Sequence, residues 1–171
     1  MAENVSLELE MTDEFVIEDT QEGKYLTFAL GNEEYGIEIE HVTEIIGIQN
    51  ITELPDTPDF VKGVINLRGK VIPLIDVRLR FLLKEKEYDD RTCIIVVNLQ
   101  NMSVGLIVDC VSEVIDIPAQ NVELPPKINN SKSSRYIKGL GKAQDSVKIL
   151  LDIQKLLFGD EIEQIADSMS S

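Results

Sequence analysis

The sequence is short of the residues on which catalysis, metal binding and disulfide bonding depend. Of its 171 residues two are cysteine, one is histidine and none is tryptophan. Cys93 and Cys110 lie inside apolar runs without a CxxC spacing, which favours small buried hydrophobic residues over a disulfide or a metal site. His41 has no second histidine, cysteine pair or acidic triad at ligand spacing, so we expect it to be structural or solvated. No metal ion or cofactor is therefore expected.

Motifs of the common enzyme classes are also missing. The chain has no phosphate-binding loop, no dinucleotide fingerprint and no nucleophile elbow. No apolar run approaches the roughly 18 residues that a membrane span needs, and the acidic N-terminus lacks the basic start of a signal peptide. We expect a non-enzymatic, cytosolic protein without direct membrane insertion.

Lysine and arginine are scarce, and they are absent from the two ends of the chain. The net charge is −15, yet residues 1–22 hold eight acids and residues 159–171 hold four, with no lysine or arginine in either segment. Residues 23–158 keep 19 of the 31 acids and all 16 bases. We expect a flexible acidic N-terminal extension and an acidic, partly helical C-terminal tail. A nucleic-acid partner is disfavoured, because binding to phosphate needs clustered basic residues.

The chain contains an internal duplication. Phe60–Phe81 aligns with Tyr136–Leu157 from end to end without a gap. Upstream, Tyr35–Ile46 aligns with Val104–Ile115, again without a gap. The order of the parts is kept and only the length of the connecting loop differs, so we expect two similar subdomains that face each other across a seam.

Short β-like segments separated by turns predict an all-β fold with short helices. Turn signals include Arg68-Gly69 and Gln144-Asp145, and the spacing of the segments is typical of small barrels or sandwiches. We expect one domain over residues 23–158, made of two intertwined subdomains at about 35–81 and 104–157. The segments rich in β-branched or aromatic residues are Tyr25–Leu30, Tyr35–Ile39, Val71–Ile75, Thr92–Asn98, Val104–Asp109 and Val147–Leu151.

Asp76 and Asp152 occupy equivalent positions of the duplication, each between a strand and a short amphipathic stretch. Such an aspartate can cap the free N–H groups of a first helical turn. A symmetric carboxylate pair also occurs in two-lobed β enzymes such as aspartic proteases. Those enzymes follow the aspartate with Thr or Ser and then Gly, whereas Val77-Arg78 and Ile153-Gln154 follow here. Helix capping is therefore the favoured interpretation.

One long motif lies in the first copy, and it carries a family resemblance. The motif reads Leu54-Pro55-x-x-Pro58-x-Phe60-x-x-Gly63-Val64-x-Asn66-Leu67-Arg68-Gly69-x-Val71-Ile72-Pro73-Leu74-Ile75-Asp76. It resembles the signature of the CheW family of bacterial chemotaxis coupling proteins. The runs 28–36 and 104–114 are similar to that family too, and the resemblance covers roughly residues 24–158.

Arg68 is the residue of this motif that folding does not require. A hairpin turn needs no arginine, and Gln144 stands at the aligned position of the second copy. Arg68 is either a solvated turn residue or one half of a charged pair beside a recognition groove. The expected carboxylate is Glu44, which arginine could hold through two hydrogen bonds.

The resemblance implies two SH3-like five-stranded β-barrel subdomains around a hydrophobic seam, and no enzymatic activity. CheW-like proteins bridge the cytoplasmic tips of methyl-accepting chemoreceptors to the regulatory domain of the histidine kinase CheA, at membrane-associated receptor arrays. A receptor helical hairpin is expected in the groove between subdomains, and the kinase domain is expected end to end against the first subdomain. The alternative is a CheW-like receptor- or kinase-binding module of another two-component signalling system.

The resemblance also implies site residues, although several could act only by keeping the subdomains folded. Cys93 departs from the aliphatic residue that is usual at its position. For kinase contact no motif exists, and the segment around Tyr35, Ile37 and Ile39 is the expected region. The positions implied for receptor binding and assembly are Val42, Glu44, Gly63, Arg68, Cys93, Gly105 and Val114.

Overall fold

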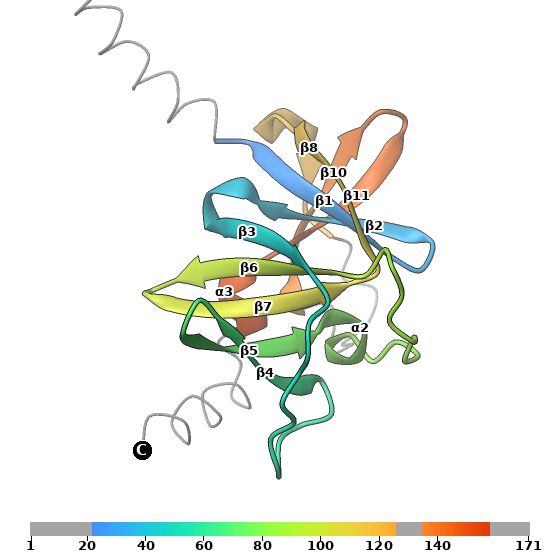
Figure 1. Cartoon of the computed structure of the whole chain (residues 1–171). Coiled ribbons are helices and arrows are strands. Elements are labelled where there is room, and N and C mark those ends of the chain that lie inside the picture. Colours follow the sequence, from blue (N-terminus) through green and yellow to red (C-terminus); the bar gives the residue numbers. More distant parts are fainter. Residues whose placement is uncertain (1–21, 126–134, 158–171) are drawn as a thin grey trace, which may run out of the picture.

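The computed structural model describes residues 22–125 and 135–157, and β-strands dominate them. These strands form a six-stranded sheet in the order β8-β1-β2-β11-β10-β9 and a five-stranded sheet in the order β3-β6-β7-β5-β4 (Figure 1). The predicted all-β class is confirmed. The strands are β1 (Lys24–Leu30), β2 (Glu33–Glu38), β3 (Val42–Gly47), β4 (Val61–Leu67), β5 (Lys70–Asp76), β6 (Cys93–Leu99), β7 (Met102–Val108), β8 (Cys110–Asp116), β9 (Val122–Glu123), β10 (Ile137–Ala143) and β11 (Ser146–Leu151).

Helices in the described residues are short, and the two α-helices begin at the paired aspartates. The Asp76 carboxylate accepts a 3.3 Å hydrogen bond from the backbone N–H of Leu79, and the Asp152 carboxylate accepts one of 3.1 Å from Lys155. The predicted capping role of both aspartates is confirmed. None of the described helices is long and apolar enough to cross a membrane. The helices are η1 (Ile39–His41), α2 (Val77–Arg80), η2 (Ala119–Asn121) and α3 (Ile153–Leu157).

The two copies of the duplication exchange a hairpin. When the alignment that pairs Tyr35 with Val104 is extended upstream, it also maps β1 onto β6 and β2 onto β7. The repeat therefore begins earlier than the sequence motifs indicated. In the five-stranded sheet β6 and β7 lie between β3 and β5, whereas in the six-stranded sheet β1 and β2 lie between β8 and β11. Each sheet thus receives its inner hairpin from the other copy.

A glycine–leucine contact recurs where the exchanged hairpin joins its sheet. Parallel pairing places Leu74 opposite Gly105 and Leu150 opposite Gly36. A Cβ added at Gly105 would lie 2.4 Å from Leu74 Cδ2, and one added at Gly36 would lie 3.0 Å from Leu150 Cδ2. Glycine is needed at these strand positions because the leucine side chain packs over the backbone.

The seam between the sheets is one continuous apolar core. Phe28, Tyr35, Phe81 and Tyr136 form a chain of aromatic contacts through it, with successive ring centroids 5.8, 5.5 and 5.8 Å apart. Smaller apolar clusters lie on the outer face of each sheet. The predicted hydrophobic seam is present. Its fully buried members, which come from both sheets and from α3, include Phe28, Leu30, Ile37, Ile95, Leu106, Leu151, Leu156 and Leu157.

Expectations about strand number, barrel closure and the cysteines are confirmed only in part or stay untested. One sheet has the expected five strands, but the other gains the two-residue β9, whose counterpart in the first copy is a single bridge between Thr52 and Val64. The SH3-like barrel stays a prediction, since the strand pairing establishes two sheets only. Cys93 and Cys110 are free cysteines, but they are half-buried where the sequence predicted buried residues. The predictions for the acidic N-terminal extension and the acidic C-terminal tail fall almost wholly on residues 1–21 and 158–171, which lie outside the described residues.

Candidate partner-binding site

Arg68 stands at the first position of the tight turn between β4 and β5. Its φ is +53° and that of Gly69 is +84°, which is the left-handed geometry of a two-residue hairpin turn. The Asn66 side-chain oxygen accepts a 2.8 Å hydrogen bond from the Gly69 N–H and steadies the turn. The local sequence therefore fixes the direction in which the arginine side chain leaves the hairpin.

The Arg68 guanidinium binds the Glu44 carboxylate in the two-point geometry predicted for the pair. Nη1 donates to Oε1 at 2.8 Å and Nη2 donates to Oε2 at 2.7 Å. The hydrogen bond from Arg68 holds the pKa of Glu44 below its usual range, and the same bond raises the pKa of Arg68. Of the two interpretations of Arg68, the charged pair is the one the structure contains.

The pair connects the two edges of the five-stranded sheet. Glu44 lies on β3, the first strand of that sheet, and Arg68 adjoins β4, the last. The Arg68 side chain is 73% exposed and that of Glu44 is 26% exposed, so a planar, oriented charge pair lies at the surface. Exposed pairs contribute little to folding, so this pair is better suited to recognition than to stability.

The other residues implied for receptor binding are spread over both sheets. Gly63 has φ +142°, and an added Cβ would lie 2.1 Å from the Thr52 carbonyl oxygen. Backbone packing thus requires glycine at position 63, whereas side chains of Leu74 and Ile94 crowd Gly105. Val42 and Cys93 are half-buried, whereas Val114 on β8 is 49% exposed. Surface available to a partner is thus present at Arg68, Glu44 and Val114, and absent at the two glycines.

The segment expected to contact a kinase is largely internal. Tyr35 is 9% exposed, Ile37 is 0% exposed, and both belong to the central core. Ile39 is half-buried and retains some surface at the start of η1. Kinase contact by this segment stays a prediction. Of its three named side chains, Ile39 is the one that a partner could reach.

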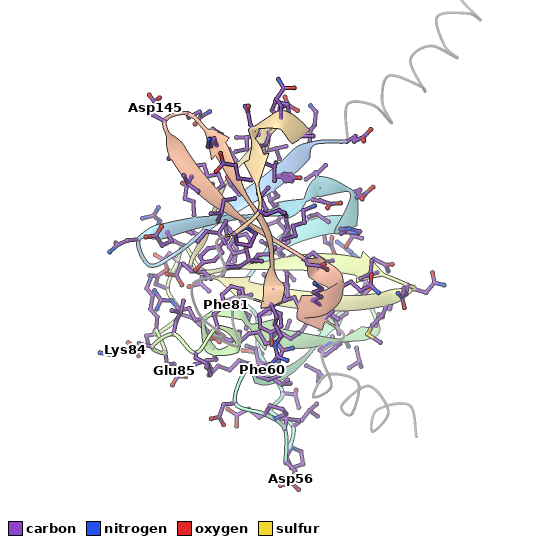
Figure 2. All side chains as sticks on the ribbon, turned by 180° about the vertical axis from the view of Figure 1, so that it is seen from behind. Asp56, Phe60, Phe81, Lys84, Glu85 and Asp145 are labelled. Carbon is purple, nitrogen blue, oxygen red and sulfur yellow. The ribbon has the colours of Figure 1, made fainter. Side chains whose placement is uncertain are left out.

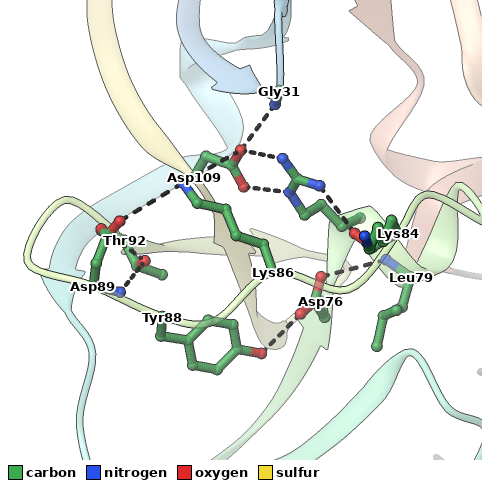
Figure 3. Close-up of polar contacts among 10 residues, drawn as sticks. Gly31, Asp76, Leu79, Lys84, Lys86, Tyr88, Asp89, Thr92 and Asp109 are labelled. Atoms are coloured by element: carbon green, nitrogen blue, oxygen red, sulfur yellow. Dashed lines mark hydrogen bonds and ion pairs between the residues drawn. The ribbon is translucent and has the colours of Figure 1, made fainter.

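Sequence reasoning missed an ion-pair network beside α2. Arg78 binds Asp109 through two hydrogen bonds of 2.7 Å, and the Tyr88 hydroxyl donates to Asp76 at 2.8 Å (Figure 3). Burial and the hydrogen bond to Asp76 raise the pKa of Tyr88. Because the partners are distant in sequence and Arg78 aligns with the neutral Gln154 of the other copy, no motif marked this network.

His41 lies beside two acidic residues that are close to it in the sequence. Its Nε2 atom lies 3.7 Å from carboxylate oxygens of both Glu38 and Glu40, and candidate ligand atoms of the three residues lie within 4.8 Å of one another. Two carboxylates thus lie near His41, and its expected structural or solvated role stays a prediction. The Lys138 ammonium binds Glu38, so the cluster already contains a cation.

Comparison with known proteins shows the family of this chain. Residues 24–161 match the family model described as CheW-like domain. The chain belongs to the CheW family. It is 42% identical over 139 residues to the chemotaxis protein CheW of Klebsiella aerogenes, with 81% of this chain and 84% of that protein covered. It is 34% identical over 146 residues to the CheW of Treponema pallidum, with 83% and 86% covered.

A solved structure of the family shares the fold. The scaffolding protein TtCheW from Thermoanaerobacter tengcongensis superposes with a TM-score of 0.75 at 35% identity, with 81% of this chain and 94% of that chain covered. The CheW family consists of non-enzymatic scaffold proteins, and the Klebsiella and Treponema relatives are named as chemotaxis proteins. The chain is therefore a CheW-type adaptor, in agreement with the resemblance of its first-copy motif.

Proposed function

We propose that this CheW family member couples chemoreceptors to the histidine kinase CheA in the cytoplasm. In this proposal it binds the cytoplasmic tip of methyl-accepting receptors and the regulatory domain of CheA, and is recruited by them to membrane-associated arrays. Its output is geometry: it holds receptor and kinase in a fixed relation, so that ligand occupancy changes autophosphorylation. No step requires a cofactor or a catalytic side chain.

The observation that carries the proposal is the Arg68–Glu44 pair. Two copies of one fold share the residues that build it, but the second copy has Gln144 where the first has Arg68. The pair is exposed and rigidly oriented, and the fold of the second copy does without it. A feature that folding does not require, at the motif that marks the family, favours a role in binding partners.

A pull-down with a receptor cytoplasmic fragment and CheA tests the proposal. The full chain is expected to retain both proteins, and Arg68→Ala is expected to weaken ternary assembly by about tenfold with its unfolding midpoint kept. Glu85→Ala is the matched control, because it removes the Lys62–Glu85 pair, another exposed ion pair of the first copy, whose N–O distance is 2.7 Å.

Folding and binding are measured on the same samples, by urea denaturation and by pull-down. If the folded chain retains neither receptor nor kinase, the proposed function is wrong. An Arg68→Ala variant that unfolds would instead assign the arginine to stability.

A further inference from the structure

The second copy carries an open pocket at the place that corresponds to the Arg68–Glu44 pair. The pocket has a volume of about 540 Å³ and lies between β8 and the β10–β11 turn, and Glu113, Val114, Lys142 and Gln144 are among the residues that line it. The neighbouring Asp145 marks this turn at one end of the molecule (Figure 2). The volume is within the range of ligand pockets, roughly 300–1,000 Å³.

Strand register shows that the correspondence is one of structure as well as sequence. On β3, Glu44 pairs with Val96 of β6, beside a bulge. On β8, Glu113 lies beside the matching bulge, and its backbone N–H and C=O both bond the Thr27 hydroxyl of β1, at 3.1 and 2.8 Å. Thr27 is the counterpart of Val96 in the alignment that maps β1 onto β6. Both glutamates therefore occupy the same place on equivalent edge strands.

The turn opposite Glu113 also has the geometry of its counterpart. Gln144 has φ +52°, against +53° for Arg68, so the two side chains leave their turns in the same backbone conformation. In the first copy the guanidinium crosses to Glu44 and binds it. In the second copy the carboxylate is kept and the guanidinium is replaced by a shorter, neutral amide.

The remaining charges leave Glu113 available. Within the described residues the Glu113 carboxylate makes no ion pair or hydrogen bond, whereas Lys142 is paired with Glu123 and Asp116 lies 3.8 Å from Lys24. Val114, 49% exposed, supplies an apolar wall. The pocket thus presents one free carboxylate and an apolar surface, which suits the charged head and aliphatic stem of a long basic side chain.

We propose that this pocket receives the guanidinium of an arginine supplied by a partner protein, which binds Glu113 as Arg68 binds Glu44. The planar fork of arginine matches a carboxylate at two points, which a lysine ammonium does not. We take the occupant to be a protein because the proposed function is that of an adaptor. The inference rests on the proposed function in this respect only. The chemistry of the pocket is tested without a receptor or a kinase.

The experiment titrates the full chain, labelled with ¹⁵N, with the peptide acetyl-Ala-Arg-Ala-amide and follows the backbone amides by NMR. Saturable shifts are expected at residues 113–116 and 142–144. Glu113→Gln is expected to weaken binding about tenfold, because the carboxylate supplies both acceptors. Glu53→Gln, a change of an exposed glutamate in the other copy, is expected to leave binding unchanged.

Gln144→Arg is the decisive variant. It places an arginine on the turn that faces Glu113, so it should form the missing pair within the chain and abolish peptide binding, while the unfolding midpoint confirms that the variant folds. The proposal is overturned if the peptide causes no saturable shifts there, if Gln144→Arg still binds it, or if the corresponding leucine or lysine peptide binds as tightly. None of these results bears on the pull-down with receptor and kinase, so the two proposals fail separately.

Discussion

Arg78 and Asp109 form an ion pair in which Nε and Nη2 each donate to a different carboxylate oxygen at 2.7 Å. Arg78 belongs to α2, and Asp109 lies where the chain passes from β7 of one sheet to β8 of the other. The backbone N–H of Gly31, in the β1–β2 turn, donates to the same carboxylate at 2.8 Å. One carboxylate therefore ties segments of both sheets together, and it fixes the relation between the halves of the adaptor.

Replacing Asp109 with asparagine is expected to destabilise the fold. The Asp109 side chain is 11% exposed and that of Arg78 is 17% exposed, so the variant leaves a largely desolvated guanidinium with a neutral partner. We expect a loss of about 2–3 kcal/mol in the free energy of unfolding, measured by urea denaturation. Asp90→Asn, on the connection between β5 and β6 that also contains Arg78, is exposed and is expected to change stability by less than about 0.5 kcal/mol. Equal losses in the two variants would contradict this role.

The same carboxylate makes stability depend on pH in a defined direction. Burial raises the pKa of Asp109, but the hydrogen bonds from Arg78 and Gly31 outweigh burial and hold that pKa below its usual value. A group with a depressed folded pKa stabilises the fold above its unfolded pKa, about 4, and loses that contribution as the pH falls through the folded pKa. The stability gap between wild type and Asp109→Asn should therefore be full at pH 7 and shrink below about pH 4. A gap that is constant from pH 7 to pH 2 would show that the ionised carboxylate is not its source.

Gly63 is expected to be required for folding, and any effect of its substitution on partner binding should follow from unfolding. An alanine there would combine a backbone at φ +142° with a Cβ 2.1 Å from the Thr52 carbonyl oxygen. We expect Gly63→Ala to lose about 3 kcal/mol of unfolding free energy. Gly47, on β3, has open space where a methyl group would lie and serves as control, with a change within about 0.5 kcal/mol. A stable Gly63→Ala chain that fails to bind partners would assign this glycine to the interface.

Local chemistry made much of the fold predictable from the sequence. Asp76 and Asp152 cap their helices as expected, since capping depends on residues within one turn. The pairing of Arg68 with Glu44 was predictable because comparison of the two copies singles out Arg68 as a turn residue that the fold does not need. The edge strands β3 and β8 were missed as strands, because each is half exposed and lacks a strong apolar alternation.

What the sequence did not reveal depends on distant contacts. The hairpin exchange requires that β1 pair with β8, which lies far away along the chain, and no local pattern encodes that pairing. Tyr35 and Ile37 were named as candidate kinase contacts although no motif marks such contacts in the sequence. The exchange places their strand inside the six-stranded sheet and turns both side chains into the core. The Arg78–Asp109 pair escaped notice for the same reason.

Exchanging the charges of Arg68 and Glu44 distinguishes the contribution of the salt bridge from that of each side chain alone. Arg68→Glu and Glu44→Arg each place two like charges where a guanidinium and a carboxylate lie 2.7 Å apart, and each is expected to weaken ternary assembly with receptor and CheA by about tenfold. The double variant restores opposite charges between β3 and the β4–β5 turn. If the bridge itself shapes the binding surface, the double variant should recover most of the assembly lost by the single variants, measured as receptor-stimulated autophosphorylation. The double variant could instead assemble as weakly as the single variants. That result would mean that a partner contacts one of these side chains directly and recognises which strand carries the positive charge and which the negative.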